Sequence, residues 1–390
     1  MIKRLIDETN RLIENDSFSI ILRPDVLRNA WLYEREQREK PIVMRSQPTH
    51  VEIEMTNRCN LACTQCLRSL GLKPYKLGDM DPENYKAILA QFPYAYNISL
   101  NGFGEPLMHQ HFFDIVAYTR KVRSWAKVSI YTNGTLIDDA TAERLIDCGL
   151  TDLNVSVDAA KPDTYRRVRR GGKLEPLHAN IRRLLKARQD KHGRFPNIGL
   201  NFVMVNDNEG ELVEFVEQAV DLGVDYINCI SWAAYDWGFK NTRDPDSYLR
   251  ELDAAQTRMA ELGIRCRWMP EISTRWTDPT KPFDCNFYWG YSVRVTYDGH
   301  VTLGCCSPFK ETYSYGSVLE QPFLEIWNGP KFRKNRELTL KRIAPCKTCA
   351  SCDMFCKSFF SGQPARDGDG YVPIAALTGA GASSGARVAS

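Results

Sequence analysis

The sequence has no apolar run near the ~20 residues that a helix needs to cross a bilayer. It also has no charged-then-apolar segment of the secretory type at its start, so it gives no sign of export. A net charge of only +3 argues against a nucleic-acid partner, because nucleic-acid-binding proteins usually gather a basic face. These absences predict a cytoplasmic protein of 390 residues that binds neither membranes nor nucleic acid.

Cysteine, in contrast, is abundant, with 13 residues. In a reducing compartment, clustered thiols bind metals more often than they form disulfides. Cys59, Cys63 and Cys66 have the spacing C-x3-C-x2-C directly after a predicted strand at 51–56. Three thiolates in one loop can hold three corners of a cubane iron–sulfur cluster and leave the fourth iron without a protein ligand. A zinc knuckle needs four ligands, and no histidine or fourth cysteine lies nearby.

This cysteine loop resembles the signature loop of the radical S-adenosylmethionine (SAM) enzymes. The resemblance implies that SAM chelates the open iron of a 4Fe-4S cluster through its amino and carboxylate groups. It further implies reductive cleavage of SAM to a 5′-deoxyadenosyl radical, which abstracts hydrogen from an unactivated C–H bond. A flavodoxin or ferredoxin is then expected as the electron donor.

Strand-like runs alternate with amphipathic helical stretches from residue 51 onward, as in βα units around a parallel sheet. Strands are predicted at 51–56, 96–100, 126–132, 152–157, 198–205 and 226–231. Helices are predicted near 82–91, 110–123, 138–148, 174–189, 210–222 and 247–262. Six such units match the α/β fold of the radical SAM family, a partial (β/α)6 barrel related to the TIM barrel. Cofactor and substrate are expected at the carboxyl ends of the strands.

Composition predicts four regions along the chain. Residues 1–45 carry apolar positions at helical spacing and form a short helical preface. Residues 46–275 form the partial barrel. In residues 276–366, cysteines, aromatic residues and turn residues replace the alternating pattern. The tail at 367–390 is rich in glycine, alanine and serine, has little to bury, and is expected to be disordered.

The segment N-G-F-G-E-P at 101–106 resembles the family's G-G-E-P motif with one residue inserted. Glycine lets a backbone approach a ligand closely, and the resemblance implies that Gly102 and Gly104 present carbonyl groups to the SAM ammonium. Glu105 would complete the neutralisation of that cation. The ends of the later strands supply further candidates for the adenosyl, ribose and methionine parts of SAM: Asn133, Ser156, Asp158 and Asn206.

The segment Y-R-R-V-R-R-G-G at 165–172 resembles the family's Y-x-x-I-R-G stretch. The resemblance nominates Arg169 as the partner of the SAM carboxylate, because a guanidinium group can bind a carboxylate in a bidentate manner. With four arginines in five positions, Arg167 is the alternative.

Seven further cysteines lie within about 70 residues near the C-terminus. The segment V-T-Y-D-G-H-V-T-L-G-C-C at 295–306 and the later C-x2-C elements resemble the SPASM or "twitch" extension, which holds one or two auxiliary 4Fe-4S clusters. The final spacing, C-x2-C-x2-C-x3-C, is compressed, so the number of clusters stays open, as does the choice between Cys305 and Cys306. A zinc ribbon is the alternative. The candidate ligands are Cys285, Cys305, Cys306, Cys346, Cys349, Cys352 and Cys356.

The function implied by the resemblance is that of a radical SAM oxidoreductase or epimerase. The preface is short for a peptide-recognition module, and twitch-type members often modify carbohydrates and aminocyclitols of natural-product pathways, antibiotics included. A small sugar-like substrate that is oxidised or epimerised is therefore predicted. Cys229, in the predicted strand at 226–231, is a candidate hydrogen donor for epimerisation, and Trp232, Tyr235, Trp237 and Trp289 are candidates for a sugar-stacking pocket.

Three other functions are compatible with the sequence. One is a SPASM maturase that acts on a ribosomal peptide, and another is a radical decarboxylase or dehydratase of a sugar. The third is a zinc-binding interaction or nucleic-acid protein, which would be colourless and would bind its partner in a salt-dependent manner.

Overall fold

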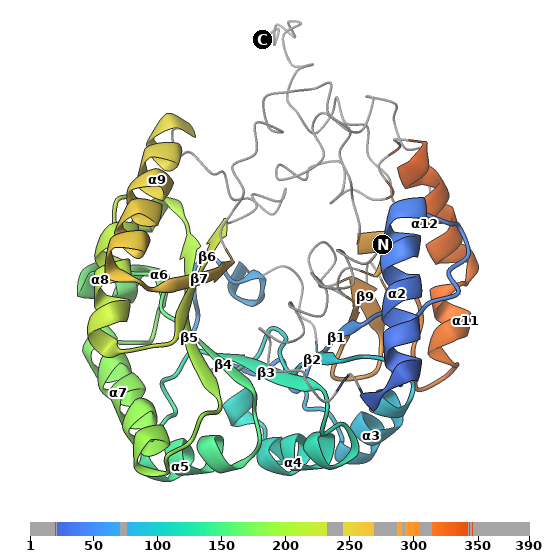
Figure 1. The fold of residues 1–390 in the computed structure, drawn as a ribbon, viewed down its shortest axis with the longest axis horizontal. Helices are drawn as coiled ribbons and strands as arrows, with labels where there is room; N and C mark the ends of the chain where they lie inside the picture. Colours follow the sequence, from blue (N-terminus) through green and yellow to red (C-terminus); the bar gives the residue numbers. More distant parts are fainter. Residues whose placement is uncertain are drawn as a thin grey trace, which may run out of the picture.

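The structure, a computed structural model, describes residues 20, 22–70, 76–231, 245–268, 287–290, 293–303, 314–341, 343 and 345. In this part of the chain, nine strands form one sheet in the order β7-β6-β5-β4-β3-β2-β1-β8-β9. Figure 1 shows the sheet bending into an open arc, with the helices on its outer side. The predicted α/β fold with a partial barrel is confirmed.

The first seven strands all run parallel to their neighbours. They are β1 (His50–Ile53), β2 (Asn97–Ser99), β3 (Lys127–Thr132), β4 (Asp152–Ser156), β5 (Asn197–Met204), β6 (Tyr226–Ser231) and β7 (Arg265–Trp268). The first six coincide with the predicted strands. Strand β7 was not predicted, because its four residues, Arg-Cys-Arg-Trp, lack the β-branched run of a buried strand.

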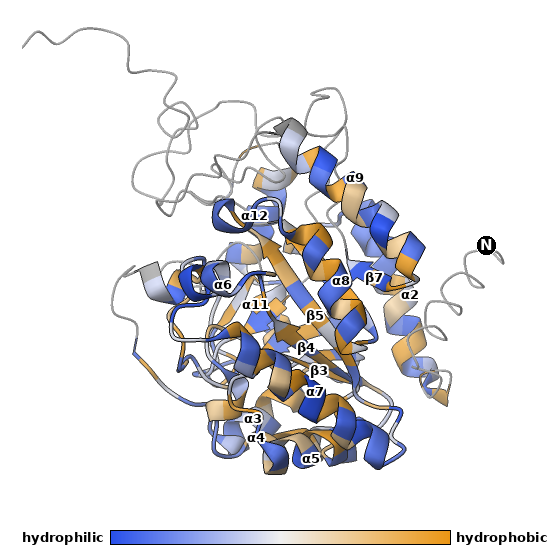
Figure 2. Ribbon diagram, turned by 90° about the vertical axis from the view of Figure 1, so that its left-hand side faces the viewer, coloured by the Kyte–Doolittle hydropathy of each residue, from blue (hydrophilic) through white to orange (hydrophobic). Residues whose placement is uncertain are grey.

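Helices return the chain from one strand to the next: α3 (Pro82–Ala90), α4 (Phe112–Val122), α5 (Asp139–Asp147), α6 (Pro162–Val168), α7 (Leu174–Asp190), α8 (Leu212–Leu222) and α9 (Pro245–Leu262). Short 3-10 turns follow some strands: η2 (Leu67–Leu70), η3 (Pro106–Met108) and η4 (Asn206–Asn208). Asp81 caps α3 by accepting from the backbone N–H groups of Glu83 and Asn84. The core lies between sheet and helices, and Figure 2 shows the apolar colour on β3, β4 and β5.

The C-terminal hairpin extends the barrel sheet. Strand β8 (Val293–Val295) pairs in parallel with β1 and antiparallel with β9 (Val301–Leu303). Beside it lie η6 (Phe287–Trp289), α11 (Phe323–Trp327), α12 (Pro330–Leu340) and the N-terminal helix α2 (Pro24–Glu39) (Figure 1). The hairpin is therefore continuous with the barrel at the edge where the cysteine loop begins.

Some predictions fall outside the described residues: the apolar positions before residue 20, the tail at 367–390 and the seven C-terminal cysteines. Among the helices that the structure does describe, none combines the length and the apolar character of a membrane span.

Candidate active site

The three clustered cysteines lie on the loop between β1 and η2. Cys63 is buried, and Cys59 and Cys66 are half-buried. Burial raises the pKa of the Cys59 and Cys66 thiols, and the neighbouring thiols act in the same direction, as expected for sulfur atoms that lie close together. Coordination to a metal deprotonates a thiol outright, so these sulfurs would be thiolates in the loaded site.

Donors from this loop and from two other loops point at these sulfur atoms. The backbone N–H of Leu61 donates to Sγ of Cys59 at 3.5 Å, and Nδ2 of Asn133 lies 3.8 Å from the same atom. Nη1 of Arg169 lies 3.6 Å from Sγ of Cys63. Such donors stabilise thiolate charge and influence the potential of an iron–sulfur cluster.

The donor set fits a cluster better than a single ion. In the described residues, no three histidine, cysteine or carboxylate side chains are placed to hold one metal ion. Three thiols are one ligand short of a closed tetrahedral zinc site, whereas their number and loop placement suit three corners of a 4Fe-4S cluster. The Nε atom of Arg169, buried beside the loop without a hydrogen-bond partner in the described part, also fits an anionic ligand.

The glycine-rich loop after β2 packs against the start of the cysteine loop. The backbone N–H groups of Gly104 and Glu105 donate to the carbonyls of Thr56 (3.1 Å) and Arg58 (2.7 Å). A Cβ atom on Gly104 would lie 2.2 Å from the Thr56 carbonyl oxygen, so no larger residue fits without a shift of backbone. A Cβ atom on Gly102 would lie 2.3 Å from Cγ of Glu54. In this structure the glycines bring two loops together.

Glu54 joins three segments of the site. Its carboxylate accepts from the backbone N–H groups of Phe103 (2.9 Å) and Tyr297 (3.2 Å). Burial raises the pKa of Glu54, and these two donors act against that rise. This role of Glu54 could not be predicted, because the alternation of a strand indicates which face a side chain is on but not which groups it contacts.

Glu105 holds the end of β3. Its buried carboxylate accepts from Oγ1 of Thr132 (2.6 Å) and from the backbone N–H groups of Asn133 (2.7 Å) and Leu107 (3.2 Å). Burial raises the pKa of Glu105, and these donors oppose the rise. A carboxylate has about four acceptor positions, so most of its capacity is used inside the protein. The predicted contact with the SAM ammonium thus has at most one acceptor position left.

Asn133 is brought to the cysteine loop. Its Nδ2 atom donates to Oδ1 of Asn60 at 2.8 Å, and Nδ2 of Asn60 donates to Oγ1 of Thr135 at 2.8 Å. The turn after β3 is thereby tied to the loop that follows β1. Asn60 was not predicted as a site residue, since its partner lies more than seventy positions away along the chain.

Arg169 and Asp158 form a buried ion pair next to Cys63. Asp158 is completely buried, has a left-handed backbone with φ of 60°, and also accepts from Gln65 Nε2 (2.7 Å) and the Val203 N–H (2.8 Å). Burial would lower the pKa of Arg169, but the charges of Asp158 and Cys63 raise it above the ordinary value. Asp158 therefore orients the guanidinium group toward the cysteine loop.

The structure separates the two arginine candidates. Arg167 points outward, where it donates to Oγ1 of Thr164 (3.0 Å) and the carbonyl of Asp207 (3.5 Å). Of the two, only Arg169 lies at the cysteine loop. Ser156 is half-buried at the end of β4, and Asn206 is exposed at the start of η4.

The inner face of the arc is lined with polar side chains. Nδ2 of Asn228 donates to Oδ1 of Asn154 (3.1 Å) and of Asn201 (2.8 Å), and Tyr226 also donates to Asn154 (2.8 Å). Nδ2 of Asn201 is buried without a partner in the described part. A cavity of ≈ 160 Å³ adjoins this face, lined by Asn97, Lys127, Ser129, Tyr131, Asp152, Asn154, Tyr226, Asn228 and Arg267.

The predicted role of Cys229 as hydrogen donor is not supported by its position. Strand alternation places Asn228 on the inner face and Cys229 on the opposite face, where it is completely buried in the core. A hydrogen bond with Cys266 and burial both raise the pKa of the Cys229 thiol. Trp289 is likewise core, because its buried indole N–H donates to the Pro41 carbonyl (2.9 Å). Trp232, Tyr235 and Trp237 lie outside the described residues.

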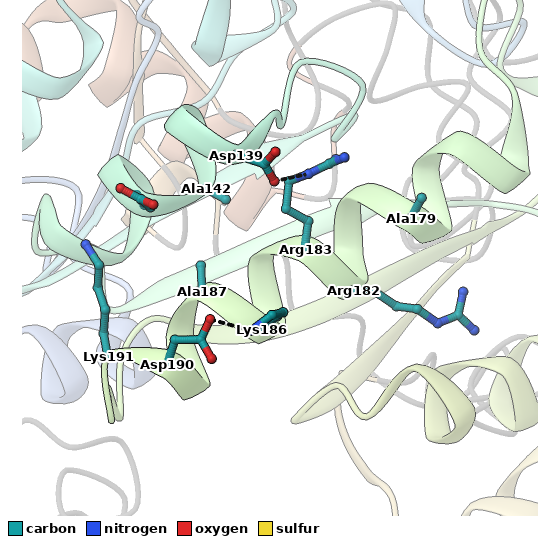
Figure 3. Close-up of a pocket in the computed structure, with 10 residues that line it drawn as sticks. Asp139, Ala142, Ala179, Arg182, Arg183, Lys186, Ala187, Asp190 and Lys191 are labelled. Carbon is teal, nitrogen blue, oxygen red and sulfur yellow. Dashed lines mark hydrogen bonds and ion pairs between the residues drawn. The ribbon is translucent and has the colours of Figure 1, made fainter.

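A larger depression of ≈ 440 Å³ lies between α5 and α7, on the helix layer (Figure 3). Its charged side chains pair with one another, as in the ion pairs of Arg183 with Asp139 and of Lys186 with Asp190, both at 2.6 Å. None of the predicted site residues lines it.

Comparison with known families agrees with this geometry. The radical SAM superfamily model matches residues 53–219, and the SPASM iron–sulfur cluster-binding domain model matches residues 285–353. The chain belongs to the radical SAM superfamily. As a radical SAM enzyme with a SPASM domain, it uses SAM and 4Fe-4S clusters as cofactors.

Relatives match this radical SAM chain over most of its length. The tungsten-containing aldehyde ferredoxin oxidoreductase cofactor-modifying protein of Pyrococcus furiosus is 27% identical over 329 residues, 78% of this chain and 87% of that protein. The PqqA peptide cyclase of Gluconobacter oxydans is 26% identical over 313 residues, 78% of this chain and 83% of the cyclase. SuiB of Streptococcus suis bound to SAM has a similar fold, with a TM-score of 0.64 at 14% identity, over 86% of this chain and 77% of SuiB.

These relatives contradict the predicted substrate. A sugar-like small molecule as partner, with oxidation or epimerisation of that sugar, is wrong, because the relatives are a peptide cyclase and a cofactor-modifying protein. A short N-terminal region does not by itself define what the barrel binds, so it could not tell a peptide from a sugar.

Proposed function

We propose that this radical SAM enzyme oxidises a polypeptide substrate. The observation that carries the proposal is the match to a PqqA peptide cyclase over 78% of the chain. The inner face of the arc supports it, because Nδ2 of Asn201 is buried there without a partner in the described residues and can donate to a peptide carbonyl.

Cys59, Cys63 and Cys66 would hold the SAM-binding cluster, and Arg169 would bind the SAM carboxylate. When bound, cluster and SAM supply the reductive cleavage that yields a 5′-deoxyadenosyl radical, which removes a hydrogen atom from the substrate. Asp158 keeps the Arg169 guanidinium at the loop, and Glu105 keeps the turn after β3 against it. Gly102 and Gly104 let the two loops meet.

Net oxidation is favoured over epimerisation because the Cys229 thiol faces the core, where it cannot return a hydrogen atom to a substrate radical. After the hydrogen atom is removed, net oxidation requires an acceptor for one electron from the substrate radical. The SPASM cysteines in residues 276–366 would bind one or two auxiliary clusters that accept it: Cys285, Cys305, Cys306, Cys346, Cys349, Cys352 and Cys356.

The test is anaerobic turnover of the reconstituted enzyme with SAM and a candidate precursor peptide encoded beside its gene. Oxidation predicts loss of paired hydrogen atoms from the peptide in tandem mass spectra, and deuterium transfer from labelled peptide into 5′-deoxyadenosine. In the variant Asn201→Ala, which removes that amide without a partner in the described residues, peptide turnover should fall while SAM cleavage without peptide continues. An unchanged peptide together with a modified low-molecular-mass compound would contradict the proposal.

The relative from Pyrococcus furiosus supports a second candidate, modification of a metalloenzyme cofactor, since it matches a similar share of this chain. The same turnover experiment separates the two candidates. If a cofactor is the substrate, the deuterium found in 5′-deoxyadenosine should come from a labelled cofactor precursor and not from any peptide.

A further inference from the structure

Helix α6 and the turn after it carry a group of exposed basic side chains. Between residues 161 and 175, five basic side chains and two acidic ones, Asp163 and Glu175, are exposed. The net charge of the whole chain is only +3, so this concentration is local. We name these residues the α6 patch: Lys161, Arg166, Arg167, Arg170 and Lys173.

One end of the α6 patch, at Arg170, lies against the cysteine loop. The backbone N–H groups of Ala62 and Thr64 donate to the carbonyls of Arg170 (3.0 Å) and Val168 (2.9 Å). Nη1 of Arg169, between these two residues, lies 3.6 Å from Sγ of Cys63. The Arg170 end of the patch thus adjoins the loop proposed to hold the SAM-binding cluster.

Most of the charge of this patch is not neutralised within the protein. In the part of the chain that the structure describes, Arg166 pairs with Asp163, whereas Lys161, Arg170 and Lys173 form no ion pair. The depression between α5 and α7 is the opposite case, because its arginines and lysines each pair with an aspartate. Figure 3 shows two of these pairs, Arg183 with Asp139 and Lys186 with Asp190. On an ordinary solvated helix face, charged side chains pair with one another, as they do in the depression between α5 and α7. The α6 patch has positive charges without such partners in the described residues, so it fits an external anionic partner.

We infer that the α6 patch docks a small acidic electron-transfer protein of the flavodoxin or ferredoxin class. One electron leaves the reduced carrier and enters the iron–sulfur centre held by the cysteine loop, so the carrier is oxidised by one electron and no covalent bond forms between the two proteins. The reductive cleavage of SAM requires that electron. The Arg170 end of the patch adjoins the cysteine loop, which favours an electron donor over a substrate or a nucleic acid.

The test compares two reductants in SAM cleavage without added substrate, so it does not depend on the proposed peptide chemistry. The variant R170E/K173E reverses two unpaired charges of the patch, and K186E/K191E makes the same change in charge at the depression between α5 and α7. With a reduced acidic flavodoxin or ferredoxin at low salt, R170E/K173E should lower kcat/KM for the carrier by about tenfold, because electrostatic steering raises association rates by at least that factor. With dithionite, all three proteins should cleave SAM at rates within about twofold of one another, since a small reductant needs no docking surface.

A second readout is the affinity of the oxidised carrier for the full chain, measured against salt concentration. The wild-type affinity should fall steeply as salt rises, and the difference from R170E/K173E should vanish when charges are screened. The inference is overturned if R170E/K173E keeps the wild-type carrier-supported rate, or if neither carrier supports cleavage by the wild-type protein. It is also overturned if cleavage by R170E/K173E with dithionite falls in parallel, because the patch would then stabilise the loop. Loss of only a salt-sensitive binding of RNA would overturn it too, because the patch would then bind nucleic acid.

Discussion

Asp158 forms an ion pair with Arg169 in which the carboxylate side chain is completely buried and the guanidinium side chain is 12% exposed. The pair lies between β5 and the cysteine loop, because Asp158 also accepts from Val203 and Gln65. Removing one member of a buried pair leaves the other charge without compensation. The pair therefore couples the stability of the barrel to the position of the Arg169 guanidinium group beside Cys63.

Replacing Arg169 by methionine should lower the free energy of unfolding by about 3–5 kcal/mol, because the Asp158 carboxylate would remain buried and unpaired. Urea unfolding of the wild type, R169M, D158N and the double variant measures the coupling. The double variant should regain part of the stability but not the affinity for SAM, because it still lacks the guanidinium group. The outward-pointing Arg167 is the control, with R167M within about 0.5 kcal/mol of the wild type. Equal losses in R169M and R167M would show that the buried pair has no special weight.

Gly104→Ala should disturb the cysteine loop more than the barrel. The added Cβ would lie 2.2 Å from the carbonyl oxygen of Thr56 and 2.5 Å from that of Arg58, and a backbone atom cannot rotate away as a side chain can. We expect a loss of about 1–3 kcal/mol in unfolding free energy, typical of overpacking, together with lower iron content after reconstitution. Gly193→Ala is the matched control, because its Cβ would meet the nearest atoms at an ordinary 3.5 Å. Full iron content in Gly104→Ala would contradict the packing role.

The barrel could be predicted because buried parallel strands leave a strong local signal. Runs such as 198–205 are apolar and are followed by turn residues, and each is separated from the next by an amphipathic helix. Strand β7 lacks that signal: its Arg267 forms an ion pair with Asp152 and stacks on Tyr226, contacts that depend on residues distant in sequence. An edge strand held by such contacts is not visible in a single sequence.

The site was predictable where spacing alone defines the chemistry, as for Cys59, Cys63 and Cys66. Spacing does not tell which group a side chain will contact. The contact of Glu105 with the SAM ammonium stays a prediction, whereas the acceptance by the same carboxylate from Thr132 and Asn133 could not be predicted from spacing. Cys229 was placed in the correct strand, but a shift of one residue decides between the inner face and the core.

Arg336 should matter for the attachment of the N-terminal segment. It is completely buried, and it donates to the carbonyls of Tyr288 (2.8 Å) and Ile42 (2.9 Å). Burial lowers the pKa of Arg336 to about 9, so these acceptors and the ring of Trp327, 4.3 Å away, only partly offset the cost of burying the charge. Arg336→Met should leave both carbonyls without a donor and lower stability by about 1–3 kcal/mol.

Hydrogen exchange locates this effect. Amides around Ile42 should exchange faster in Arg336→Met, whereas those of β4 and β5 should keep their protection. Replacing the exposed Arg333 on the same helix by methionine should change neither, since it points to solvent. Faster exchange throughout the barrel would argue against a local attachment.

Cys63 and Cys349 should fail in different ways when each is replaced by alanine. Cys63→Ala removes the buried member of the three-cysteine loop, so the SAM-dependent change in the electron paramagnetic resonance spectrum and the cleavage of SAM should both disappear. Cys349→Ala alters the SPASM region, so it should lower the iron content and abolish product while part of the SAM cleavage survives. Cys148→Ala, at the C-terminal end of α5, controls for the loss of a thiol and should leave iron and SAM cleavage unchanged. SAM cleavage depends on the loop that follows β1, so it should survive in part in Cys349→Ala, whereas product formation tests the auxiliary cluster. Full product formation by Cys349→Ala would show that this cluster is dispensable for the reaction.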